Sequence, residues 1–427
     1  MKTYQSYKPS GIEWIGDIPE KWKKSKYKYN ISILSGFPFK SELFDKIEGF
    51  PLMRIRDISS GNIETYYKGE YQKEYIVKKG DIVIGMDGEF NIREWDNNDI
   101  LLNQRCCKIK KTENLLLKYV YYTLPFDLRI INDLTYYTTV KHLSVDDLKN
   151  ISCITPPLQE QQQIVNYLDE KTTIIDKLIS IKERKIELLK EQRKSLVNEV
   201  VTKGLNPFVK MKDSGVEWIG EIPENWSFVR LGVLGKFSKG KGITKDKIKE
   251  KGFPCIRNGE IYTTYNLRFS KPNSFIDEQT INESIKVKKG TLFFTGDGET
   301  LEEIGKCVVY LGDEEIYVGG GINVFTPNNE KVSPIYLSYV MSSTSSVYQK
   351  SKGGKGEIVV HIYSKQLRDI QFGLPKLDEQ QKIVDYLDKH TKEIDDLVQL
   401  EQNKIELLKE YRQSLISEVI TGKIKVI

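Results

Sequence analysis

Basic side chains recur beside glycines in the loops of this chain, a combination that suits contact with a polyanion. The segments SKGKGI at 238–243 and SKGGKGE at 351–357 alternate lysine with glycine. Glycine lets a backbone approach a phosphate closely, and the amines neutralise its charge. Arg257 precedes Asn258, and these residue types can form paired hydrogen bonds with guanine and adenine, respectively. The loops therefore predict binding to double-stranded DNA.

The candidate DNA-binding residues are spread over two parts of the chain. In the first part they are Lys40, Arg54, Arg56, Arg93, Arg105, Lys141 and His142. In the second part they are Lys239, Lys241, Arg257, Asn258, Lys352, Lys355 and His361. A chain with 65 Lys and Arg residues has basic loops somewhere, so a solvated surface remains the alternative for each residue taken singly. For the two histidines we favour packing at the start of a short helix over contact with DNA.

The sequence lacks the motifs that usually carry catalysis or hold metal ions. It has no GxxxxGK[ST] phosphate loop and no GxGxxG between a strand and a helix. Asn206-Pro207-Phe208 resembles the Asn-Pro-Pro-aromatic motif of adenine methyltransferases, but it lacks the second proline. Asp87 and Asp297 lie in the turns GMDGE and TGDGE without a third carboxylate or a lysine at nuclease-like spacing, so we interpret them as turn residues. We expect no catalytic residue and no metal site, and an enzyme with an unrecognised site is the alternative.

The composition is typical of a soluble protein with two or more domains. The 427 residues are 39% hydrophobic and 29% charged, and the net charge is only +5. No run of about 18 apolar residues occurs, and the opening MKTYQSYKPSGIEW lacks the apolar core of a signal peptide. The five cysteines form no CxxC pair, which indicates reduced thiols. We therefore expect a cytoplasmic location and no contact with a membrane.

The chain contains an internal duplication. The heptamer KIELLKE occurs at 185–191 and again at 404–410, inside the segments 156–202 and 375–421, which are identical at more than half of their positions. Further matching pairs are SGIEWIGDIPEKW at 10–22 with SGVEWIGEIPENW at 214–226, and VKKGDIVIGMDGE at 77–89 with VKKGTLFFTGDGE at 287–299. Because the pairs keep one order, the sequence predicts a variable half followed by a conserved helix, written twice.

Two long helices are predicted from the conserved segments. Residues 159–202 and 378–421 contain no proline or glycine, and each helix would be about 66 Å long at 1.5 Å per residue. Heptad spacing predicts an apolar seam on both helices. The seam residues are Ile175, Ile179, Lys182, Ile186, Leu189, Arg193, Leu196 and Val200 in the first helix, and Ile394, Val398, Glu401, Ile405, Leu408, Arg412, Leu415 and Val419 in the second.

The two seams predict an antiparallel coiled coil. If the helix centres are matched, Arg193 faces Glu401 and Lys182 faces Arg412. Two alternatives stay open, because a seam of this kind could also pack on its own globular domain or pair with a second copy of the chain.

The variable halves are predicted to be mixed α/β domains, because strand-turn-strand patterns alternate with short helical ones. The predicted fold class is therefore α+β, with two mixed α/β domains joined by two long repeated helices that form an antiparallel coiled coil with internal pseudo-twofold duplication. We place the boundaries at 1–157 for the first domain, 158–204 for the first helix, 205–376 for the second domain and 377–427 for the second helix.

These motifs resemble those of the specificity (S) subunit of Type I restriction–modification systems. The resemblance rests on PPLQEQQQIVNYLD at 156–169 and its second copy, the helix ends SLVNEVVT and SLISEVIT, and the linker GLNPFVKMKDSGVEWIGEIPENW at 204–226. It covers essentially the whole chain in the order that the family shows.

The resemblance implies a non-catalytic subunit with two target-recognition domains, each reading one half of an asymmetric, gapped DNA site. It implies that the helices carry two modification subunits, which bind S-adenosylmethionine and methylate adenine. Restriction subunits would add translocation and cleavage that need ATP and Mg. None of these cofactors is expected on this chain.

The resemblance implies roles for only a few individual segments. It makes Gln159–Asp169 and Gln380–Asp388 the helix starts that face the partner, and it places the loops before His142 and His361 near DNA. The alternatives are a coiled-coil adaptor whose domains bind proteins, and a decoy or silent specificity copy. Binding to DNA would depend steeply on salt, whereas adaptor function would not.

Overall fold

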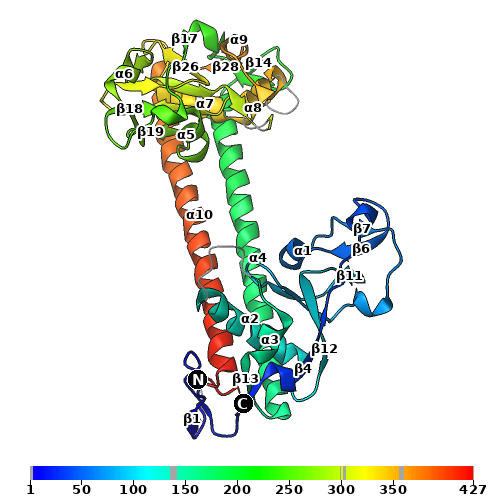
Figure 1. Ribbon diagram of the computed structural model, residues 1–427. Coiled ribbons are helices and arrows are strands. Elements are labelled where there is room, and N and C mark those ends of the chain that lie inside the picture. The colour runs from blue at the N-terminus through cyan, green and yellow to red at the C-terminus, as the bar shows by residue number, and fades with distance from the viewer. Residues whose placement is uncertain (1–2, 135–141, 299, 302–303, 355–359, 427) are drawn as a thin grey trace. The chain divides into compact units, whose positions relative to one another are not determined.

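The structure is a computed structural model that describes residues 3–134, 142–298, 300–301, 304–354 and 360–426. The chain forms two compact units: unit 1 is Met1–Lys182 with Asn403–Ile427, and unit 2 is Glu183–Gln402. Each unit combines a mixed α/β domain with parts of two long helices, α4 (Leu158–Lys203) and α10 (Leu377–Ile420) (Figure 1). The predicted fold class is therefore confirmed. None of the described helices is both long and apolar enough to cross a membrane.

Unit 1 contains two sheets, a four-stranded one of order β10-β9-β12-β4 and a five-stranded one of order β5-β7-β6-β11-β8. It also contains two further strand pairs, β1-β2 and β3-β13. The strands are β1 Tyr7–Pro9, β2 Asp17–Pro19, β3 Lys23–Lys26, β4 Ile31–Ser35, β5 Phe44–Asp45, β6 Phe50–Met53, β7 Tyr66–Tyr67, β8 Ile76–Val77, β9 Ile82–Gly85, β10 Ile92–Glu94, β11 Ile100–Leu102, β12 Cys106–Thr112 and β13 Ser152–Thr155. Its short helices are α1 Ile55–Ser60, α2 Leu117–Leu134 and α3 Val145–Asn150.

Unit 2 repeats this plan, with sheets of order β17-β26-β22-β24-β19 and β20-β18-β25-β21 and the strand pairs β14-β15, β16-β28 and β23-β27. The strands are β14 Met211–Asp213, β15 Glu221–Pro223, β16 Ser227–Arg230, β17 Gly235–Lys239, β18 Phe253–Ile256, β19 Arg268–Phe269, β20 Ser274–Ile276, β21 Ile285–Val287, β22 Leu292–Thr295, β23 Asp297–Gly298, β24 Cys307–Tyr310, β25 Ile316–Val318, β26 Ile322–Pro327, β27 Val360–His361 and β28 Gln371–Leu374. Its short helices are α5 Asn258–Thr263, α6 Glu278–Ile281, α7 Pro334–Ser342, α8 Thr344–Gly353 and α9 Ser364–Arg368.

The repeated VKKG sequences form matching turns between strands. Gly80 and Gly290 have φ angles of 92° and 86°, a left-handed backbone that glycine adopts without strain. Each turn leads into a fully buried strand, β9 or β22, whose apolar run belongs to the core. The predicted strand-turn-strand pattern is confirmed in both halves.

In each mixed α/β domain, the last strand pairs with a strand near the beginning of the domain. In unit 1, β3 pairs antiparallel with β13, so that Lys23 lies opposite Thr155. In unit 2, β16 pairs antiparallel with β28, so that Ser227 lies opposite Leu374. The chain therefore enters and leaves each domain at one place, next to the start of a long helix.

The long helices pack into the domain cores at their ends. In unit 1, Ile164 and Leu168 of α4 join the core together with Leu415 and Val419 of α10. In unit 2 the roles are exchanged, since the core takes its helix residues from the end of α4 and the start of α10. Parts of the predicted seam, including Ile175, Val200, Leu415 and Val419, thus contact the domains, as one of the alternatives proposed.

Within each unit the two helices run antiparallel, but the register differs from the centred one that we predicted. Arg193 Nε donates to Asp395 Oδ1 at 2.9 Å in unit 2, and its repeat counterpart Arg412 donates to Asp176 Oδ1 at 2.9 Å in unit 1. Glu401 is buried and pairs with Lys185 at 2.9 Å. The predicted pairing of Arg193 with Glu401 is therefore wrong, because Arg193 binds Asp395 and Glu401 binds Lys185.

The other predicted seam residues are mostly shielded from solvent. Ile186, Leu189, Ile394 and Ile405 are buried. Four more are half-buried, namely Ile179, Leu196, Val398 and Leu408. The predicted seam is therefore less exposed to solvent than the charged faces of the helices.

Candidate nucleic-acid interface and helix surface

Each domain holds a histidine–aspartate pair at the same point of its fold. His142 Nδ1 and Asp87 Oδ1 are 2.6 Å apart in unit 1, and His361 Nδ1 and Asp297 Oδ1 are 2.5 Å apart in unit 2. The imidazoles are 64% and 43% exposed, and each lies just before a short helix, α3 or α9, so the packing at the helix start that we favoured stays a prediction. The turn aspartates, which we had interpreted as turn residues only, hold the rings at the surface.

Arg105 binds the same carboxylate in unit 1. Its Nη1 donates to Asp87 Oδ2 at 2.5 Å, while the Asp87 side chain is only 11% exposed. Burial disfavours the Asp87 carboxylate, but the hydrogen bonds from His142 and Arg105 outweigh it and lower the pKa of Asp87. The three side chains line an open cavity of about 650 Å³, whose wall also includes Gln104. The structure thus brings two predicted residues, Arg105 and His142, to one concave site.

The equivalent place in unit 2 carries different side chains. A Cβ atom added at Gly321 would lie 3.5 Å from Asn258 Cγ and 3.5 Å from Asp297 Oδ2. Asn258 begins α5, and its buried Oδ1 has no hydrogen-bond partner among the described residues. Asn258 and His361, both predicted from the sequence, therefore both lie near Asp297.

The other candidates of the first part bind neighbouring side chains or lie free at the surface. Arg93 pairs with Asp96 at 3.2 Å. Arg54 and Arg56 flank the start of α1, where the Arg54 guanidinium lies over an aromatic ring and Arg56 binds a glutamate. Lys40 is exposed, whereas Lys141 lies outside the described residues.

The other DNA-binding candidates of the second part also either contact neighbouring side chains or are exposed. Arg257 Nε donates to Ser274 Oγ at 3.2 Å. The Lys352 amine lies 4.6 Å from the ring centre of Trp218 and 4.7 Å from that of Tyr348. Lys239 and Lys241 are exposed, and Lys355 lies outside the described residues.

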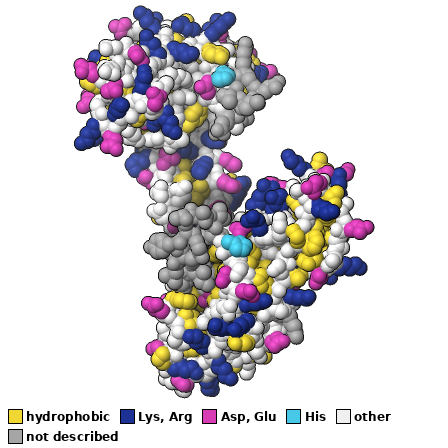
Figure 2. All heavy atoms as spheres, viewed as in Figure 1, with side chains coloured by type: hydrophobic (Ala, Val, Ile, Leu, Met, Phe, Trp, Pro, Cys, Tyr) yellow, Lys and Arg dark blue, Asp and Glu magenta, His cyan; other side chains and the backbone are white. Residues whose placement is uncertain are grey.

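Surface charge alone does not single out a binding face. Figure 2 shows Lys and Arg side chains over the visible face of both units, interspersed with Asp and Glu. In the described part of the chain, no group of three or more His, Cys, Asp or Glu side chains could hold a metal ion. The five cysteines are free and buried, and burial raises the pKa of the Cys106 and Cys307 thiols to about 12.

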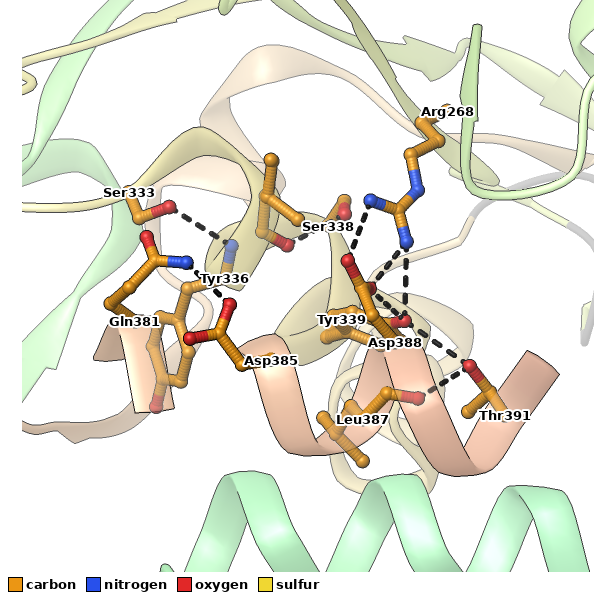
Figure 3. Close-up of polar contacts among 11 residues, drawn as sticks. Arg268, Ser333, Tyr336, Ser338, Tyr339, Gln381, Asp385, Leu387, Asp388 and Thr391 are labelled. Atoms are coloured by element: carbon orange, nitrogen blue, oxygen red, sulfur yellow. Dashed lines mark hydrogen bonds and ion pairs between the residues drawn. The ribbon is translucent and has the colours of Figure 1, made fainter. Parts of the chain in front are cut away.

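A tyrosine, an aspartate and a threonine fasten each domain to its own long helix. In unit 2, Tyr339 Oη donates to Asp388 Oδ1 at 2.6 Å and lies 3.3 Å from Thr391 Oγ1 (Figure 3). Burial, aided by the hydrogen bond to Asp388, raises the pKa of Tyr339 to about 12. In unit 1 the matching side chains repeat both distances, 2.6 Å and 3.3 Å, and they are Tyr122, Asp169 and Thr172.

The cation beside this aspartate comes from a different element in each unit. Arg268 of β19 binds both carboxylate oxygens of Asp388, one of them at 3.0 Å (Figure 3). Lys118 of α2 approaches Asp169 at 3.6 Å and also binds Glu94. Sequence analysis missed these contacts, although the helix residues match across the repeat. The cations do not match, so the repeat could not have revealed them.

The helix starts that we expected to face a partner are only partly exposed. Gln161 and Gln380 are completely buried and bind the backbone of their own domains, which corrects that expectation for these two residues. The next residue in each copy is exposed and forms the same bond, from Gln162 to Asn166 at 2.8 Å and from Gln381 to Asp385 at 2.8 Å. The second of these bonds is visible in Figure 3.

Large apolar side chains are exposed at matching positions of the two helices. On α4 three of them lie at spacings of three and seven residues, which places them on one face of the helix. They are Leu178, Ile181 and Leu188, and their counterparts on α10 are Leu397, Leu400 and Leu407. These six side chains, which we call the outer apolar stripes, are between 42% and 63% exposed.

Comparisons with known proteins agree with this architecture. The family model described as "Type I restriction modification DNA specificity domain" matches residues 19–191 and 223–407. The chain is 29% identical over 428 residues to the Type I restriction enzyme EcoBI specificity subunit of Escherichia coli, covering 97% of this chain and 88% of that protein. It is 24% identical over 414 residues to the Type I restriction enzyme MjaVIII specificity subunit of Methanocaldococcus jannaschii, covering 96% of this chain and 94% of that one.

The fold also matches a solved structure. A chain from "Structural basis underlying complex assembly and conformational transition of the type I R-M system" aligns with a TM-score of 0.71 at 16% identity, covering 95% of this chain and 99% of that one. At this identity the match supports the fold alone. The family model, by contrast, matches the chain twice, and the two matched segments together cover most of the sequence. The chain therefore belongs to the Type I restriction modification DNA specificity family, and it is a non-catalytic specificity subunit with two target-recognition domains.

Proposed function

We propose that this chain reads a two-part, gapped DNA site, with one half-site bound by each recognition domain, and that its repeated helices carry two modification subunits. The outer apolar stripes are the observation that carries this proposal. Exposed apolar side chains that gather on one face can form a protein–protein interface. Two rows with the same residue spacing fit two copies of one partner. The recognition domains differ in sequence around their Asp–His pairs, as two different half-sites require.

The partners supply the chemistry in this proposal. The modification subunits bind S-adenosylmethionine and methylate an adenine in each half-site. Restriction subunits, where present, use ATP and Mg to translocate and cleave DNA. The complex works in the cytoplasm, where the DNA is. We propose an active subunit and not a decoy copy, because both helices carry a stripe and both domains carry an Asp–His pair.

Adenine-methylation mapping tests this function. The chain is expressed with its methyltransferase subunit in a host that lacks DNA methylation, and each protein is then omitted in turn. We expect a gapped two-part motif only when both proteins are present. Methylation that needs the methyltransferase alone would contradict the proposal and favour the adaptor. No methylation under any condition, although the two proteins co-purify, would favour the silent copy.

The outer apolar stripes lead to a quantitative prediction. Leu188→Ser should leave a complex with one modification subunit, and Leu188→Ser together with Leu407→Ser should leave none. Because both leucines are exposed, stability should change by less than about 0.5 kcal/mol. The stoichiometry can be measured by light scattering of the purified complexes.

Ile174 provides the matched control. It is 48% exposed on α4, but its counterpart in α10 is Glu393, so it belongs to no repeated surface. Ile174→Ser should keep both modification subunits bound. Loss of a subunit from this control, or full occupancy in the Leu188/Leu407 double variant, would place the partner elsewhere.

A further inference from the structure

The turn between two core strands has the same backbone in both domains but carries different side chains. It joins β11 to β12 in unit 1 and β25 to β26 in unit 2. In both turns the carbonyl of the third residue accepts a backbone hydrogen bond of 2.8 Å, from Met86 to Arg105 and from Gly296 to Gly321. Arg105 therefore occupies the place that Gly321 has in the second domain.

This position has a left-handed backbone, which an arginine adopts only with strain. The φ angle is 71° at Arg105 and 76° at Gly321. Glycine adopts this conformation without strain, and the second domain has a glycine, Gly321, at this position. An arginine held there indicates a function beyond forming the turn, because strained residues concentrate at functional sites.

The Arg105 guanidinium is held in place and remains accessible. Among the described residues, Asp87 is the one whose side chain hydrogen-bonds to this guanidinium. The donor is Arg105 Nη1 alone. The Arg105 side chain is 66% exposed, whereas Asp87 is nearly buried and is bound on its other oxygen by His142. Asp87 and His142 thus hold in place a guanidinium that lines an open cavity.

We propose that Arg105 reads a guanine in the half-site bound by the first domain, with Asp87 and His142 as its positioning residues. A guanidinium with a fixed direction can donate two parallel hydrogen bonds to O6 and N7 of guanine, which no other base accepts in the same way. The second domain has no side chain at this place, so it reads its half-site with other groups. This inference rests on the proposed function and assigns one base contact within it.

The test is methylation mapping with Arg105→Gly and Arg105→Lys. The glycine variant has the residue of the second domain in the same turn, so its fold is kept and its backbone strain is relieved. Both variants should accept other bases at one guanine position of one half-site, with discrimination reduced about ten- to a hundredfold. The other half-site, which is the internal control, should stay unchanged.

Asp87→Asn is the positioning variant. It keeps Arg105 but loses the charged carboxylate that orients it, so the same guanine position should relax, to a smaller extent than in Arg105→Gly. Asp297→Asn in the second domain should leave that position strict.

The outcomes separate the two claims. A wild-type chain that yields no two-part motif would contradict the proposed function and this inference with it. A wild-type motif that Arg105→Gly leaves unchanged, or that loses methylation evenly at all sequences, would contradict the role of Arg105 alone. An even loss would indicate a phosphate contact, which carries no sequence information.

Discussion

Replacing Gln380 by leucine should lower the free energy of unfolding by about 3 kcal/mol. The Gln380 side chain is completely buried, accepts from Ser333 N at 2.8 Å and donates to Pro375 O at 2.9 Å. Leucine has a similar volume but no polar atoms. Both backbone groups would then lack a partner away from water, and each such group costs about 1–3 kcal/mol.

The same experiment can be done in unit 1, because Gln161 is the repeat counterpart of Gln380. Gln161 accepts from Leu116 N at 2.8 Å and donates to Pro156 O at 2.8 Å, so Gln161→Leu should destabilise unit 1 by a similar amount. Gln381→Leu is the control, because Gln381 is exposed and should change stability by less than about 0.5 kcal/mol. Urea unfolding followed by fluorescence measures all three variants. Equal stability of Gln380→Leu and Gln381→Leu would show that the buried amide network contributes nothing.

The stability of unit 2 should rise with pH above 8 because of one buried lysine. Lys350 is fully buried and donates to Gly305 O at 2.8 Å and to Met341 O at 3.0 Å. Burial lowers its pKa from 10.5 to about 8. Below pH 8 the amine is protonated in both states, so folding must desolvate a charge. Between pH 8 and 10.5 only the unfolded chain keeps the proton, and the free energy of unfolding therefore rises with pH.

The comparison of wild type with Lys350→Met isolates this effect. Between pH 7.5 and pH 10 the wild type should gain about 2 kcal/mol relative to the variant, as measured by urea unfolding at each pH. Lys352→Met, two residues away at an exposed position, should track the wild type. A constant difference between wild type and Lys350→Met across this range would mean that the amine is not desolvated in the folded chain.

The sequence was sufficient to predict the architecture, because the duplication and the proline-free conserved segments allow few other folds. Both long helices, the turn at Gly80 and the mixed α/β domains follow from local patterns. The helix register did not follow. A heptad seam permits several registers, and the choice depends on where carboxylates such as Asp395 lie along the partner helix. That placement is a property of the folded pair.

The candidate DNA site was predicted only in part, for a similar reason. Arg105, His142, Asn258 and His361 were identified from residue type. Asp87 binds both Arg105 and His142 but looked like an ordinary turn residue, because these partners are distant in the sequence. Arg105 reaches it when β9 and β12 pair, and His142 reaches it through a separate β-bridge. Positive φ at Arg105 was also invisible, since only its counterpart is a glycine.

A chain with two copies of the first recognition domain tests the central claim most directly. Residues 27–151 would replace residues 231–370, so that the paired strands β16 and β28 frame the graft as β3 and β13 frame the original. Methylation mapping should then yield one half-site written twice, on opposite strands, across the gap. A motif that still contains the half-site of the replaced domain would contradict the account, because target choice would then lie outside the two recognition domains.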